Sequence, residues 1–186
     1  TVVLAPLAKD FTLGMRVIDA FVLVAILVTL PVTVRTKRKF LVLLAAAITT
    51  GVLLLIHRFE PQKWIAVTFH LPLLYLLAAV AGLILVDILS TSKVTVDTIA
   101  GAICVYMLIG FVFAVMYSLC ATVIPDAFVR VGFDAVAMEF HGSGFGNTIY
   151  FSFVTLTTVG YGDITPRAEV VRSLAIVEAM LGQVYL

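Results

Sequence analysis

The sequence predicts an all-α membrane protein, and its composition and patterning carry that prediction. Of the 186 residues, 62% are hydrophobic and 12% are charged, whereas a soluble domain has about 45–50% apolar and about 25% charged residues. The apolar residues are gathered into long stretches. Such a chain would expose large apolar patches in water, so a lipid bilayer is the solvent that fits it. The net charge of +1 and the scattered basic residues give no sign of a nucleic-acid partner.

Five apolar stretches are long enough, or nearly so, to cross a membrane as helices. A span needs about 20 predominantly apolar residues. Pro72 is expected to kink or bound the third stretch, because proline lacks a backbone N–H. Ser92 or Thr95 is expected to cap the start of the fourth. The stretches are residues 14–34, 40–57, 64–90, 97–124 and 169–186.

The distribution of basic residues predicts the orientation of these spans. The short connection between the first two contains Arg35, Lys37, Arg38 and Lys39. The positive-inside rule places this connection in the cytoplasm, and counting spans from there places residues 1–12 and 125–168 outside. We therefore expect a further span before Thr1, with Thr1–Ala8 as its tail. We also expect the chain to continue past Leu186, where a cytoplasmic regulatory domain would lie.

The segment 125–168 contains a short helix followed by an unusual glycine pattern. Residues 146–157 predict a helix of about 18 Å, which is too short to cross the hydrocarbon core. Thr157–Asp163, the TTVGYGD segment, comes next. Its two glycines alternate with valine and tyrosine, so the backbone can take angles that other residues resist. Such a strand can turn successive carbonyl oxygens to one side, where they can replace the water around a cation.

The TTVGYGD segment, with a short apolar stretch before it and a long one after it, resembles the selectivity filter of the tetrameric potassium-channel family. The resemblance implies a multi-pass homotetramer with membrane lipid and potassium ions as partners, because one strand cannot encircle an ion. Residues 1–96 are similar to a voltage sensor only in architecture, so six spans are expected in the full-length subunit. The implied pore domain, 97–186, has an outer helix at 97–124, a re-entrant pore helix at 146–157, the filter at 158–163 and an inner helix at 169–186.

The same resemblance implies roles for individual residues, and no cofactor beyond the permeating ions. Carbonyl and hydroxyl oxygens suit a hard cation, and the Thr158 hydroxyl is one of the implied K⁺ ligands. The carbonyl ligands are those of Thr158, Val159, Gly160 and Tyr161. The filter support and outer mouth are assigned to Thr157, Gly162, Asp163, Tyr150, Phe151 and Val154.

Three of these positions depart from the family pattern. Tyr150 and Phe151 stand where relatives often have tryptophan. The Tyr150 hydroxyl could brace Asp163, and the alternative is that both rings only pack at an interface. Val154 stands where some bacterial relatives carry glutamate, which leaves the back wall of the filter apolar.

Two residues of the last stretch are candidates for gating. Gly182 lies where the family often has a hinge glycine, and close helix packing is the competing explanation. Glu178 is a charged residue in an apolar stretch, where an exposed charge costs about 2.5–3.5 kcal/mol. It is therefore expected to face protein or water, or to stay protonated. It would serve either as a carboxyl bonded behind the filter or near the ion cavity, or as a hydrogen-bonded structural group.

The third stretch lacks the basic residues of a voltage sensor. Residues 64–90 contain no arginine or lysine. Steep voltage dependence requires charges that move across the field, so a nearly voltage-independent gate is expected.

The remaining reactive side chains do not suggest an enzyme. Cys104 and Cys120 would lie about 24 Å apart on one helix, too far for a disulfide. His57, His70 and His141 show no metal spacing and are expected at interfaces. No nucleophile–base set is apparent.

The sequence favours a potassium channel of the bacterial plasma membrane over two alternatives. One alternative is a non-conducting regulatory or scaffold subunit of a channel complex. The other is a potassium uptake transporter subunit. Such transporters carry four degenerate filter-like loops in one chain, whereas this chain has one intact copy.

Overall fold

The computed structural model describes residues 37–59, 63–91, 94–130 and 144–185. The protein is mostly helical, as the sequence predicts, although a small sheet corrects the all-α expectation. The predicted span at 14–34 lies outside the described residues. The elements are α2 (Lys37–Phe59), α3 (Lys63–Ser90), α4 (Val96–Val123), β1 (Phe128–Arg130), α5 (Gly144–Leu156), β2 (Ile164–Pro166) and α6 (Glu169–Tyr185).

Two helices among the described residues are long and apolar enough to cross a membrane. They are Val67–Ser90 within α3 and the whole of α4. The complete helices α3 and α4 have 28 residues each. Each is therefore about 42 Å long, which exceeds the hydrocarbon core of about 30 Å. The apolar part of α2 is shorter, at Leu43–Leu53. The length and composition of α3 and α4 support an integral membrane protein.

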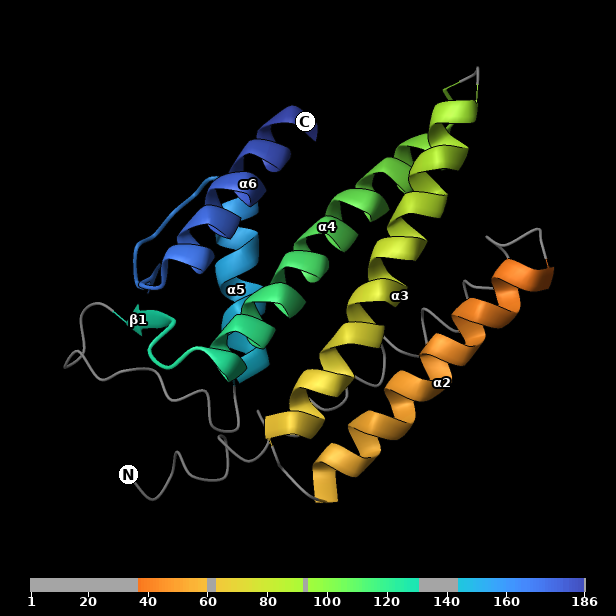
Figure 1. Ribbon diagram of the computed structural model, residues 1–186. Helices are drawn as coiled ribbons and strands as arrows, with labels where there is room; N and C mark the ends of the chain where they lie inside the picture. Colours follow the sequence, from red (N-terminus) through yellow and green to blue (C-terminus); the bar gives the residue numbers. More distant parts are fainter. Residues whose placement is uncertain (1–36, 60–62, 92–93, 131–143, 186) are drawn as a thin grey trace, which may run out of the picture.

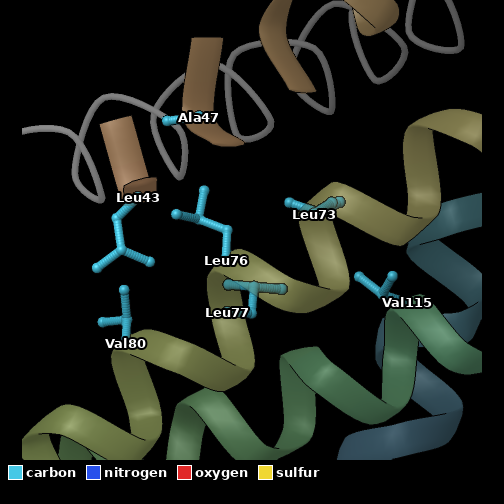
Figure 2. Packing of buried hydrophobic residues seen from close by; sticks show 7 residues of the cluster. All are labelled: Leu43, Ala47, Leu73, Leu76, Leu77, Val80 and Val115. Carbon is cyan, nitrogen blue, oxygen red and sulfur yellow. The ribbon is translucent and has the colours of Figure 1, made fainter. Parts of the chain in front are cut away.

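The helices pack in chain order, with α3 between α2 and α4 (Figure 1). Short connections join them, so neighbouring helices run antiparallel. Figure 2 shows the apolar side chains that fill the space between α2 and α3, with one contribution from α4. The buried residues of this cluster are Leu43, Ala47, Leu73, Leu76, Leu77, Val80 and Val115.

Local signals in α3 and α4 agree only in part with the sequence predictions. Helix α4 begins with a capping box, in which the Thr95 side chain accepts from the Thr98 amide and the Thr98 side chain accepts from the Thr95 amide. The cap prediction for Thr95 is therefore confirmed. Pro72 lies inside α3, so the expectation that it bounds the helix is wrong. Cys104 and Cys120 are both free, as predicted.

His70 is buried at the interface between α3 and α4. Its Nε2 lies 2.8 Å from the Ser118 hydroxyl of α4, and its ring meets Phe69 edge-on at 4.7 Å. The side chains of His57 and His141 lie outside what the structure describes.

A two-stranded antiparallel sheet connects the end of α4 to the start of α6. Strand β1 pairs with β2, and Val129 lies opposite Thr165. The amides of Arg167 and Ala168 extend this link by donating to the Ala127 carbonyl at 2.9 and 3.3 Å. A second core cluster joins α4, α5 and α6 to the two strands, and its buried residues are Phe113, Tyr117, Ala127, Phe128, Phe151, Ile164 and Val171.

Candidate functional site

The TTVGYGD segment is attached to the C-terminal end of α5 by its own backbone amides. The Thr158 amide donates to the Thr155 carbonyl at 2.9 Å. The next two amides, of Val159 and Gly160, both donate to the Val154 carbonyl, at 3.0 and 3.3 Å. In a trans peptide unit the N–H and C=O point in opposite directions. The carbonyl oxygens of these same three peptide units therefore point away from α5.

The backbone conformation of the TTVGYGD segment alternates between right-handed and left-handed. Positive φ angles occur at every second residue: Thr158 at 58°, Gly160 at 56° and Gly162 at 76°. Alternating right- and left-handed conformations collect successive N–H groups on one side of the chain, which leaves the carbonyl oxygens on the other. The sequence predicts this for the glycines. The positive φ of Thr158 is unusual for a β-branched residue and was not predicted.

In the single chain, the described residues leave the TTVGYGD segment largely open to its surroundings. Residues 157–162 are all exposed, and the side chains of Val159 and Tyr161 are 52% and 71% accessible. The segment therefore presents a row of backbone acceptors together with uncovered apolar side chains.

A pocket of about 220 Å³ lies behind the segment, between α5, β2 and α6. Five of the predicted support residues line it: Tyr150, Phe151, Val154, Gly162 and Asp163. The ring of Tyr150 stacks on that of Tyr161, with centroids 6.5 Å apart and an angle of 6° between the rings. The structure thus places Tyr150 directly behind the exposed ring of the segment. A hydrogen bond between the Tyr150 hydroxyl and Asp163 stays a prediction.

Phe151 takes part mainly in the second core cluster. It is buried, and its ring lies 4.9 Å from that of Tyr117 and 5.1 Å from that of Phe128. These edge-on contacts join α5 to α4 and β1. Phe151 therefore positions the helix from which the TTVGYGD segment begins.

Glu178 is a fully buried carboxyl at the junction of three helices. Its Oε2 accepts from the Tyr117 hydroxyl of α4 at 2.7 Å, and its Oε1 lies 2.5 Å from the Ser152 hydroxyl of α5. The Ser152 oxygen is also 2.7 Å from the Gly110 carbonyl of α4. These contacts satisfy a polar side chain that would otherwise be costly to bury, and they tie α6 to both neighbouring helices.

Helix α6 reaches the base of the TTVGYGD segment at two adjacent residues. Gly182 is buried, and a Cβ at this position would overlap the Leu156 carbonyl oxygen at the end of α5. This contact supports the close-packing explanation for Gly182, while the hinge stays a prediction. The side chain of Gln183 donates from Nε2 to the Thr158 hydroxyl at 3.3 Å.

Sequence reasoning missed the partners in these contacts. Tyr117 and Ser152 lie 61 and 26 residues from Glu178 along the chain, so no local spacing connects them. Gln183 left one signal, because it is an amide directly after a glycine, with apolar residues before and after this pair. Among the described residues there is also no group of three or more histidine, cysteine, aspartate or glutamate side chains that could hold a metal ion.

The fold and the site together define a class: a helical integral membrane protein whose glycine-containing segment presents backbone acceptors. The comparison with protein families agrees with this class, since residues 119–186 match the family described as "Ion channel". The matched part spans the end of α4, the sheet, α5, the TTVGYGD segment and α6. The match supports an ion-channel domain in this part of the chain and passive ion conduction, which is not an enzymatic activity. No curated protein and no solved structure matches the chain.

Proposed function

We propose that this chain is a subunit of a homotetrameric, potassium-selective channel. K⁺ would bind to the carbonyl oxygens of Thr158, Val159, Gly160 and Tyr161 and to the Thr158 hydroxyl. The observation that carries the proposal is the alternating φ at every second residue of the TTVGYGD segment. With the amides of three successive residues bonded back to α5, this backbone supplies a row of oxygens that suits a dehydrated hard cation.

Four copies around one axis would complete the coordination. One chain supplies oxygens from one side only, and the segment is exposed in the single chain, so it is free to face the axis. In the proposed assembly α5 is the re-entrant pore helix, since its 13 residues give about 20 Å, less than a membrane span. Its C-terminal end carries a partial negative charge of about half an elementary charge, and four such ends would favour a cation. The assembly would lie in a bacterial plasma membrane.

A flux measurement tests the proposal. The purified chain is reconstituted in liposomes, and K⁺ and Na⁺ fluxes are compared with and without Ba²⁺. We expect K⁺ flux to exceed Na⁺ flux by at least about tenfold and Ba²⁺ to block it, because K⁺ fits carbonyl coordination. Equal fluxes of the two ions would refute selectivity. The absence of flux would favour the non-conducting regulatory subunit.

Two glycine variants make the test specific to the backbone of the segment. In Gly160→Ala the new side chain is strained at a φ of 56°, so we expect the K⁺ flux to fall at least about tenfold. In Gly51→Ala the same change is made in α2, where a Cβ has no neighbour within 4 Å. This matched variant should conduct like the parent.

A further inference from the structure

The two adjacent threonines at the base of the TTVGYGD segment are held by different helices. The Thr157 hydroxyl donates to the Phe153 carbonyl of α5 at 2.6 Å. The Thr158 hydroxyl instead accepts from the Gln183 amide of α6, 25 residues further along the chain. Of the two, Thr158 is the residue that the proposed function places in contact with the ion.

The stretch of α6 that carries Gln183 is held by contacts of its neighbours. Its neighbour Gly182 lets the α6 backbone meet the Leu156 carbonyl, where any larger residue would overlap. One turn earlier, Glu178 is anchored to α4 and α5. Two residues later, the Tyr185 hydroxyl donates to the Ala102 carbonyl at 2.8 Å. The side-chain amide of Gln183 therefore reaches Thr158 from a helix that is held on both sides of Gln183 by contacts with α4 and α5.

A hydroxyl offers one hydrogen and two acceptor lone pairs. When Gln183 donates to one lone pair of Thr158, it restricts rotation of the hydroxyl, and the second lone pair remains for a cation. Without that donor the hydroxyl is free to turn its hydrogen toward the ion, which weakens coordination. The contact thus links the orientation of an ion ligand to the placement of α6.

We propose that Gln183 is a positioning residue that orients the Thr158 hydroxyl and thereby sets the ion affinity of the coordination site to which that hydroxyl contributes. This inference rests on the proposed function, because it requires that Thr158 contacts the ion. It assigns to α6 a direct role in ion binding, separate from any movement of that helix.

The test is the affinity of the site for Ba²⁺, measured as block of K⁺ current in planar bilayers and as calorimetric binding to the purified protein. Gln183→Leu keeps a similar size but removes the donor. We expect it to weaken Ba²⁺ block and binding about threefold to tenfold, the range that one hydrogen bond supports. Val184→Ala changes the next side chain, which is 84% exposed, and should leave the Ba²⁺ affinity unchanged.

A double-mutant cycle separates positioning from general damage. In a Thr158→Ala background the hydroxyl is gone, so adding Gln183→Leu should change Ba²⁺ binding no further. Light scattering verifies the assembly of every variant, and calorimetry gives a result even where a variant does not conduct. Unchanged or tighter Ba²⁺ binding in Gln183→Leu, or an equal effect in both backgrounds, overturns the inference. The proposed function fails separately, if the parent itself shows no K⁺-selective current.

Discussion

Among single residues, Glu178 best shows how a charged side chain is accommodated in an apolar helix. The sequence singles it out, because a lone acidic residue in such a stretch must find a partner. The structure supplies two hydroxyl groups from two helices. The carboxyl therefore acts as a three-way connector between α4, α5 and α6.

Removing the Glu178 carboxyl should destabilise the protein. Glu178→Ala leaves the buried Tyr117 hydroxyl without its acceptor, whereas the Ser152 hydroxyl keeps the Gly110 carbonyl. One such loss costs about 1–3 kcal/mol. We expect the thermal midpoint in detergent to fall by about 4–8 °C, which corresponds to about 2 kcal/mol for a chain of this size. The midpoint is measured by circular dichroism.

Glu178→Gln distinguishes the hydrogen bonds from the charge. The Gln oxygen can accept from Tyr117 and its amide can donate to Ser152, which frees the single Ser152 hydrogen for the Gly110 carbonyl. This variant should melt within a few degrees of the parent. Val177→Ala, at a neighbouring position that is 49% exposed, serves as the control. If Gln proves as damaging as Ala, the connector role of the hydrogen bonds is wrong.

At the residue scale the sequence shows which residues matter better than it shows which side chains they contact. The TTVGYGD motif pointed to Gly160 and Gly162, and both adopt positive φ. The motif did not indicate that the Thr158 hydroxyl would be held by Gln183, since that contact depends on how two distant helices pack. Asp163 lines the pocket behind the segment, and its role at an outer mouth stays a prediction.

At the scale of elements, the close contact between α5 and α6 depends on the absence of a side chain at Gly182. Gly182→Ala places a methyl group against the backbone oxygen of Leu156, and backbone cannot rotate aside as a side chain can. Helix α6 would have to shift. We expect both a lower thermal midpoint and a loss of K⁺ flux of at least about tenfold.

Gly82→Ala is the matched control for this prediction. The same substitution in α3 meets no atom within 4 Å, and alanine favours a helix by up to about 1 kcal/mol over glycine. Its midpoint should be unchanged or slightly higher. If Gly182→Ala instead alters gating while its midpoint stays that of the parent, a hinge is the better explanation.

The helices were predictable because their apolar stretches are long. The predicted ranges 64–90, 97–124 and 146–157 differ by at most two residues at either end from α3, α4 and α5. The sheet was missed because strands of three residues leave no periodic pattern. The expectation that Pro72 bounds the third stretch was wrong because a proline inside a membrane helix is tolerated when other groups satisfy the freed backbone carbonyl.

At the scale of the whole molecule, the distribution of charge predicts weak voltage dependence. Residues 64–90 contain no arginine or lysine, and moving one charge through the field yields only about 2.3 kcal/mol per 100 mV. We expect a conductance–voltage curve that is nearly flat between −100 and +100 mV, within about a factor of two. Single-channel recording in planar bilayers measures it. A steep sigmoidal curve would show that charges elsewhere in the chain sense the field.

The sequence predicts both the class of the molecule and its assembly, and only the class is supported so far. Hydropathy indicates a membrane protein, and the family match at residues 119–186 supports an ion channel. The division into 1–96 and 97–186 stays a prediction, and so does the four-fold arrangement. Both depend on contacts between segments or between copies, which follow from the shapes of packed surfaces rather than from composition.

The small sheet between β1 and β2 restricts how the channel-like part of the chain can move. It joins the end of α4 to the start of α6, next to the amides of Arg167 and Ala168 that bond to Ala127. Because the end of α4 and the start of α6 are held together there, any separation of α4 from α6 is a rotation about the sheet. The displacement of α6 in such a rotation is greatest near Tyr185. The hydrogen bond from the Tyr185 hydroxyl to the Ala102 carbonyl would therefore break first.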